Sequence, residues 1–134
     1  MANDSSDILN KLFIDEAETL KDLEQLVDSA SKVFRIERPS GKVIFRDFRR
    51  LTDKQRIGAL LSGKYFAAKS HVIAEHTLGI AEIAKELGRP VTSLSGPIRQ
   101  LIKEGFVEGL PDKKYSIVHH RLKDLLGSVL ASTK

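Results

Sequence analysis

The residues of this chain that could carry out metal or covalent chemistry are few and scattered. None of the four histidines belongs to a tight metal-binding motif with a carboxylate at helical spacing. They are His71, His76, His119 and His120. The absence of cysteine excludes disulfides, thiolate metal ligands and a cysteine nucleophile. Because no phosphate-binding glycine loop or nucleophile elbow occurs either, we expect no enzyme activity, no metal and no cofactor.

Charge is distributed unevenly along the chain. Residues 1–31 hold two Lys against eight Asp or Glu, a net charge of −6, whereas residues 32–134 hold 20 Lys or Arg against ten acids, a net charge of +10. A basic body suits a polyanionic partner such as nucleic acid or an anionic membrane surface, although such charges can also simply solvate a surface. Aromatic residues make up only 6% of the chain, so stacking platforms for single-stranded nucleic acid are poorly supplied.

The densest basic stretch lies between residues 32 and 50. Apolar β-branched and aromatic residues flank the turn sequence at 38–41, which predicts a β-hairpin. The basic residues outnumber Glu37 and Asp47, and they are Lys32, Arg35, Arg38, Lys42, Arg46, Arg49 and Arg50. These side chains could contact phosphates, or they could solvate a small sheet and face the acidic N-terminal helix of the same or a partner chain.

Both ends of the chain show apolar residues at helical steps, which predicts a helix over residues 7–31 and another over 119–132. The apolar positions of the first are Leu9, Phe13, Leu20, Leu23, Val27 and Ala30, and those of the second are Leu122, Leu125, Leu126, Val129 and Leu130. Glu16 interrupts the first stripe, so a strict coiled coil is not established. Each helix could pack on its own domain or form the seam of a homodimer.

The middle of the chain begins with a helix start signal. Thr52 and Gln55 have the types and spacing of a capping box, in which each side chain satisfies a backbone donor of the first turn. The helix that they open should run to about residue 70. For residues 70–77 we expect a helix end and a connecting turn.

Two further helical patterns and two strands follow. Residues 77–88 predict an amphipathic helix, with Thr77 as its cap and Gly88 in the left-handed conformation that ends it. A short turn leads to a second helix over residues 92–104, which stops before Gly105. Two short strands complete the segment, at residues 106–108 and 115–118.

This order of helix, tight turn, helix, glycine and hairpin resembles the winged helix-turn-helix family of transcription regulators. The resemblance covers about residues 52–117 and is strongest from Ala81 to Val107. Many members show the pattern E-hydrophobic-A-x-x-L-G, then apolar residues at regular steps, then L-x-x-x-G-hydrophobic-hydrophobic. The matching residues here are Glu82-Ile83-Ala84-Lys85-Glu86-Leu87-Gly88, then Leu94, Ile98 and Leu101, then Gly105-Phe106-Val107. Winged helices also serve as protein–protein modules.

The resemblance implies that residues 92–104 form the helix that enters the major groove of DNA, with its exposed early residues nearest the base edges. Arg99 would form two hydrogen bonds to guanine, and Gln100 would form two to adenine. The hydroxyl groups that would reach bases or phosphates belong to Thr92, Ser93 and Ser95. The lysines that would meet phosphates or the minor groove are Lys103 and, in the wing, Lys113 and Lys114.

Gly96 and Pro97 depart from the family's pattern, because many members place long polar side chains there. A proline also lacks the backbone donor that a helix interior requires. One resolution is a shorter helix capped by Ser95, which would put Pro97 in the first turn. In either case base readout is reduced, and recognition would depend more on phosphates and DNA shape.

Together these patterns predict a mainly α protein with small β-hairpins, of the α+β class. We divide it into an acidic N-terminal helix and possible dimerisation element (1–31), a basic β-hairpin (32–51), a winged helix-turn-helix domain (52–118) and a C-terminal helix (119–134). The expected function is binding of double-stranded DNA by a homodimeric transcription regulator or DNA-organising protein. Without a signal peptide or a membrane-length apolar run, we expect it in the cytoplasm. The alternatives are a winged-helix protein–protein adaptor in a nucleoprotein assembly and an RNA-binding module.

Overall fold

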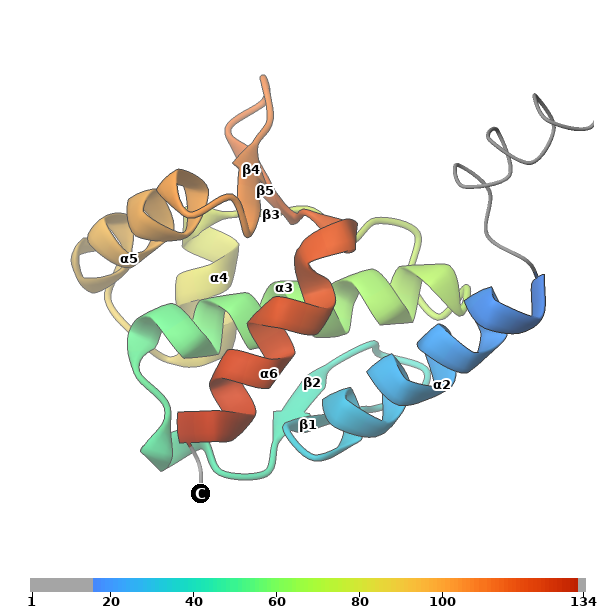
Figure 1. Ribbon diagram of the computed structural model, residues 1–134. Coiled ribbons are helices and arrows are strands. Elements are labelled where there is room, and N and C mark those ends of the chain that lie inside the picture. The colour runs from blue at the N-terminus through green and yellow to red at the C-terminus, as the bar shows by residue number, and fades with distance from the viewer. Residues whose placement is uncertain (1–15, 133–134) are drawn as a thin grey trace, which may run out of the picture.

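A computed structural model describes residues 16–132, and within them the chain has the expected α+β class (Figure 1). The α-helices are α2 (Glu16–Ser31), α3 (Asp53–Lys69), α4 (Ile80–Leu87), α5 (Val91–Lys103) and α6 (Leu122–Ser132). The strands are β1 (Phe34–Ile36), β2 (Val43–Phe45), β3 (Leu78–Gly79), β4 (Val107–Gly109) and β5 (Lys114–Ile117). Two short 3-10 helices are η2 (Phe48–Arg50) and η3 (His119–Arg121). The predicted start of the first helix, with Leu9 and Phe13, lies outside the described residues.

Helix α3 runs through the centre of the molecule. Figure 1 shows α4, α5 and the sheet of β3, β4 and β5 on one side of it, α2 and the β1–β2 hairpin on the other, and α6 crossing it. The predicted capping box is confirmed, since Gln55 N donates to Thr52 Oγ1 at 3.2 Å and Thr52 N donates to Gln55 Oε1 at 2.9 Å. Because neighbours surround α3, its residues are buried over more than two turns, from Ile57 to Lys64.

The predicted hairpin between residues 32 and 50 is confirmed as the antiparallel pair β1–β2. Phe34 and Val43 are buried against α3, whereas Arg35 lies opposite Ile44 and both are exposed on the outer face. The close approach to α3 depends on Gly63, because a Cβ atom there would lie 2.5 Å from Cγ2 of Val43. The hairpin therefore has one face in the core and one basic and apolar face in solvent.

The second sheet has the order β3-β5-β4, with both pairs antiparallel. Its β3 strand corrects the sequence prediction, which began a helix at Thr77. Leu78 and Gly79 pair instead with Tyr115 and Lys114, so α4 starts at Ile80 and Thr77 is not its cap. The first turn of α4 is closed by Glu82, whose Oε1 accepts from Gly79 N at 3.1 Å. The predicted end of this helix is confirmed, as Gly88 has a φ of 64°.

One continuous core joins all of these elements, from Ala30 in α2 to Val129 in α6. The predicted C-terminal helix is confirmed as η3 followed by α6, and the apolar face of α6 packs within its own chain. The buried residues of that face are Leu122, Leu125, Leu126 and Val129. No helix of the described residues is both long and apolar enough to cross a membrane.

Candidate nucleic-acid interface

Helix α5 is held in place by a narrow apolar face. Leu94 and Leu101 have no exposed surface and Ile98 is 2% exposed, because all three pack against α3, α4 and β4. The helix begins at Val91 after Pro90 and ends at Lys103, with Glu104 as its C-cap, and Gly105 then takes a φ of 82° to turn the chain into β4. The predicted helix over residues 92–104 is thereby confirmed within one residue at each end.

Pro97 lies inside this helix, in its seventh position, so the alternative of a shorter helix capped by Ser95 is not formed. A proline here cannot donate a hydrogen bond to the carbonyl of Ser93, four residues earlier, and its ring crowds that carbonyl. The helix continues through the proline because the buried residues on either side fix its position. Tertiary packing thus outweighs a local cost of about 3 kcal/mol.

The outer face of α5 carries the predicted contact residues. Thr92, Ser95, Arg99 and Lys103 follow one another at steps of three or four residues, which places them on one side of the helix, and all four are exposed. Gln100 is exposed beside them, and Ser93 is partly buried at the margin. A Cβ atom on Gly96 would meet no heavy atom within 4 Å. The polar side of the helix is therefore open, as the sequence reasoning required.

The β4–β5 hairpin projects beyond the body of the protein beside α5 (Figure 1). Its tip is closed by Leu110, whose N donates to Lys114 O at 2.8 Å and whose O accepts from Lys113 N at 3.0 Å. Lys113 is exposed at this tip in the left-handed conformation, with a φ of 62°. Lys114 is partly buried, and its Nζ lies 3.4 Å from Oε2 of Glu75. Of the two predicted wing lysines, Lys113 is thus the one more available to a ligand.

The charge of this surface is positive but small. Residues 91–117 hold four Lys or Arg and three Asp or Glu. Glu104 is neutralised by an ion pair with Lys54, just as Lys114 is neutralised by Glu75. The cations left without an ion pair to a described residue are Arg99, Lys103 and Lys113, and the acids left without one are Glu108 and Asp112. Few phosphates would be contacted by one copy of this surface.

The sequence did not indicate the ion-pair partners of Lys114 and Glu104. Glu75 lies 39 residues from Lys114, in the segment that we expected only to connect two helices. Lys54 lies in the first turn of α3, 50 residues before Glu104 in the sequence. No local pattern in the sequence signals pairs of this kind, because the fold brings them together.

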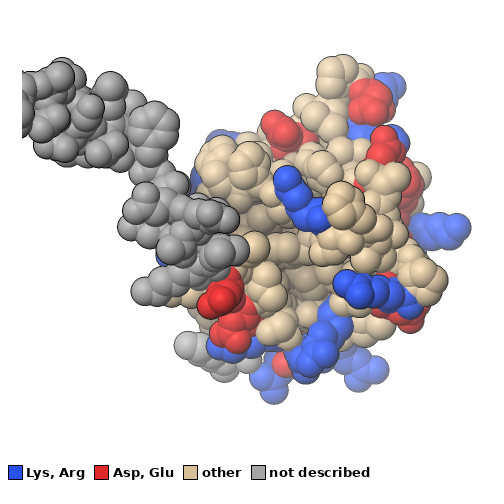
Figure 2. All heavy atoms as spheres, turned by 90° about the vertical axis from the view of Figure 1, so that its right-hand side faces the viewer, with Lys and Arg blue, Asp and Glu red and all other residues tan. Residues whose placement is uncertain are grey.

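A much stronger positive charge lies on the other side of α3. Residues 32–50 hold seven Lys or Arg against two acids. Figure 2 shows several Lys and Arg side chains along the lower edge of the face that it displays, at the height of the β1–β2 hairpin in Figure 1. The α5 surface and the basic hairpin are therefore separate surfaces, with α3 between them.

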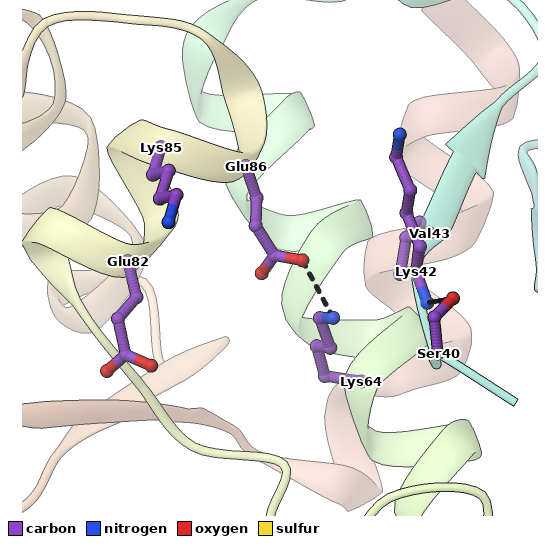
Figure 3. Close-up of a pocket in the computed structure, with 7 residues that line it drawn as sticks. All are labelled: Ser40, Lys42, Val43, Lys64, Glu82, Lys85 and Glu86. Atoms are coloured by element: carbon purple, nitrogen blue, oxygen red, sulfur yellow. Dashed lines mark hydrogen bonds and ion pairs between the residues drawn. The ribbon is translucent and has the colours of Figure 1, made fainter.

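A mixed-charge cavity separates the hairpin turn from α4 (Figure 3). Lys64 of α3 enters it almost fully buried, and its Nζ donates to Glu86 Oε1 at 2.8 Å and to Gly41 O at 3.1 Å. Lys42 and Lys85 border the same cavity. Lys64 thus links three elements, the hairpin turn, α3 and α4, through one ammonium group.

The histidines do not converge on a metal-like arrangement. His76 and His119 lie against the ring of Tyr65, with centroid separations of 5.6 and 6.3 Å, and His120 contacts His119. Across the part of the chain that the structure describes, no three histidine or acidic side chains are grouped so as to hold a metal ion. These rings form an aromatic cluster at the surface of α3.

The geometry that bears on function is therefore an open polar helix face beside a projecting hairpin. This arrangement comes from the packing of α5 on α3 and from the pairing of β4 with β5. Comparison with known proteins found no family model, no curated protein and no solved structure that matches the chain.

Proposed function

We propose that residues 52–118 form a winged helix-turn-helix domain that binds double-stranded DNA, with α5 in the major groove and the β4–β5 hairpin as the wing. The chain would act as a transcription regulator or a DNA-organising protein. The element order α3, β3, α4, α5, β4, β5 and the sheet order β3-β5-β4 support this assignment. The observation that carries it is the exposed, acid-free outer face of α5 beside the projecting hairpin.

The dimensions of α5 fit the proposed role. A helix with its side chains is about 10–12 Å wide, close to the width of the major groove at about 12 Å. Arg99 and Gln100 carry the side chains suited to base edges, while Lys103 and Lys113 suit phosphates. Gly96 presents no side chain to the groove, so the domain would rely on DNA shape and backbone contacts more than on base readout.

The charge census sets the expected salt dependence. Three cations, Arg99, Lys103 and Lys113, are exposed without an ion pair to a described residue. If each neutralises one phosphate, log K should fall with log salt at a slope of about −2.7 per copy. The affinity for duplex should then drop about 40-fold between 50 and 200 mM salt.

This proposal is tested by fluorescence anisotropy on a random-sequence duplex across that salt range. Lys113→Ala should weaken binding and reduce the slope by about 1, because one phosphate contact is lost. Lys123→Ala removes another exposed lysine, from α6, and should change neither quantity. Equal effects of both variants would place the DNA contact elsewhere on the protein.

A protein–protein adaptor is the second candidate, favoured by two apolar side chains on α5. Val91 is 42% exposed at the start of the helix and Ile102 is 38% exposed near its end. Exposed apolar groups at both ends of a helix, on a surface whose net charge is small, suit a protein partner. Absence of duplex binding even at 50 mM salt would favour this candidate over the DNA-binding one.

A further inference from the structure

The outer face of α2 combines exposed apolar side chains with acids. Leu23 and Val27 are each 48% exposed, and they line a shallow groove together with Glu24, Asp28 and Ser31. The opposite face of the helix packs on α6 and β1. Residues 16–31 hold one Lys against five acids. Large apolar side chains exposed in a row beside acids are typical of a contact surface.

The outer face of the β1–β2 hairpin has the complementary composition. Ile44 is 46% exposed, and Arg35 lies directly opposite it on β1. Arg35 and Arg38 of the hairpin and Arg49 of the following η2 are all exposed, and none forms an ion pair with a described residue. Among the side chains that the structure describes, the α2 acids make one ion pair with the basic segment of residues 32–50, between Asp28 and Lys32 at 3.4 Å. Within the described residues, Asp22 and Glu24 of α2 therefore form no ion pair, and neither do Arg35, Arg38 and Arg49.

We infer that the acidic and apolar face of α2 docks on the basic β1–β2 hairpin of a second copy of the chain. A two-fold dimer uses the same patch on both subunits, so the patch must complement itself. A surface with an acidic half and a basic half does so, because each half meets the opposite one of the partner. Leu23 and Val27 would meet Ile44 on each side, which removes apolar surface from water.

Nucleic acid is the competing occupant of the hairpin, and the surroundings argue against it. Helix α2 lies alongside β1, so a duplex on the hairpin would approach the exposed acids Asp22, Glu24 and Asp28. The hairpin also lies on the other side of α3 from α5 and the wing (Figure 1). A duplex bound at α5 would not reach it. The inference goes beyond the proposed DNA-binding role and does not depend on it.

Charge exchange between two full-length variants tests this contact by sedimentation equilibrium at about 50 mM salt, where surface charges act strongly. The helix variant carries Glu24→Lys and Asp28→Lys, and the hairpin variant carries Arg35→Glu and Arg38→Glu. Wild type should be dimeric, and each variant alone should dissociate at least tenfold more readily, because like charges then face each other in both halves. An equimolar mixture should dimerise again, since every contact in the mixed pair joins opposite charges.

Several outcomes would overturn the inference. They are a monomeric wild type at about 100 μM, a hairpin variant that still dimerises, or a mixture that stays monomeric although circular dichroism shows both variants folded. If a charge variant fails to fold, the double variant Leu23→Ser and Val27→Ser serves in its place, because it removes the apolar part of the contact. It should also be monomeric, and a dimer of this variant would overturn the inference too.

A matched control separates this inference from the proposed function. The double variant Arg99→Glu and Lys113→Glu lowers the net charge by the same amount as the hairpin variant, but on the other side of α3. It should abolish duplex binding and leave self-association unchanged. Loss of duplex binding by the hairpin variant, with its self-association intact, would assign the hairpin to DNA and reject the dimer contact.

Discussion

Replacing Pro97 by Ala should stabilise the protein, which is the reverse of the usual effect of a substitution in a packed helix. The proline lies in the seventh position of α5, where it removes the hydrogen bond to the carbonyl of Ser93. Alanine restores that donor without adding volume. The helix should therefore lose its main internal defect while Leu94, Ile98 and Leu101 remain packed as before.

The magnitude follows from three contributions. Proline inside a helix costs about 3 kcal/mol relative to alanine. Against this, proline restricts the unfolded chain by about 0.4–1 kcal/mol, and Pro97 is partly buried, so its ring loses some packing on truncation. We expect a net gain of about 1–2 kcal/mol in the free energy of unfolding. For a chain of this size, that raises Tm by about 4–8 °C.

Urea unfolding and a thermal melt followed by circular dichroism measure this change, with Pro111→Ala as the control. Pro111 is exposed in the turn between β4 and β5, outside any helix, so its replacement should lower stability by up to about 1 kcal/mol through the unfolded state. A lower Tm for Pro97→Ala would contradict this expectation, since it would mean that the proline ring contributes more by packing than it costs in the backbone.

Two further substitutions test the contacts that hold the hairpin on α3. Gly63→Ala should destabilise the protein by about 1–3 kcal/mol in urea unfolding, because its Cβ atom would lie 2.5 Å from Val43 Cγ2 and force the hairpin outward. The control is Gly127→Ala, whose Cβ atom would meet no heavy atom within 4 Å and which should not destabilise the protein. Lys64→Met should cost about 1–3 kcal/mol by the same measurement, because it leaves Gly41 O and Glu86 without their shared donor. An unchanged midpoint for Lys64→Met would show that solvent replaces that donor without cost.

Local patterns in the sequence predicted the helices well. The capping box of Thr52 and Gln55 and the left-handed Gly88 depend on residues a few positions apart, so their types and spacing are sufficient signals. The same holds for the buried side of α5, whose apolar residues recur at helical steps. Those residues also decide which side of the helix is exposed. The positions of the predicted contact residues on α5 followed from that periodicity.

Features that depend on distant partners were not predictable. The β3 strand has two residues and exists because β5, more than 30 residues later, pairs with it. The sequence left open whether Pro97 lies inside the helix or in the first turn of a shorter one, and the packing of α5 on α3 explains its interior position. The loss of Lys114 as a free cation also required Glu75, which lies in a loop without regular structure.

The claim that α5 and the wing contact DNA is tested most directly by NMR titration of the amide resonances with a short duplex at low salt. We expect the largest shift changes on residues 92–103 and 110–114, and no change in the amide shifts of β1, β2 and α2 when the duplex is added. Shift changes confined to residues 34–45, or no changes at a duplex concentration of about 1 mM, would contradict it.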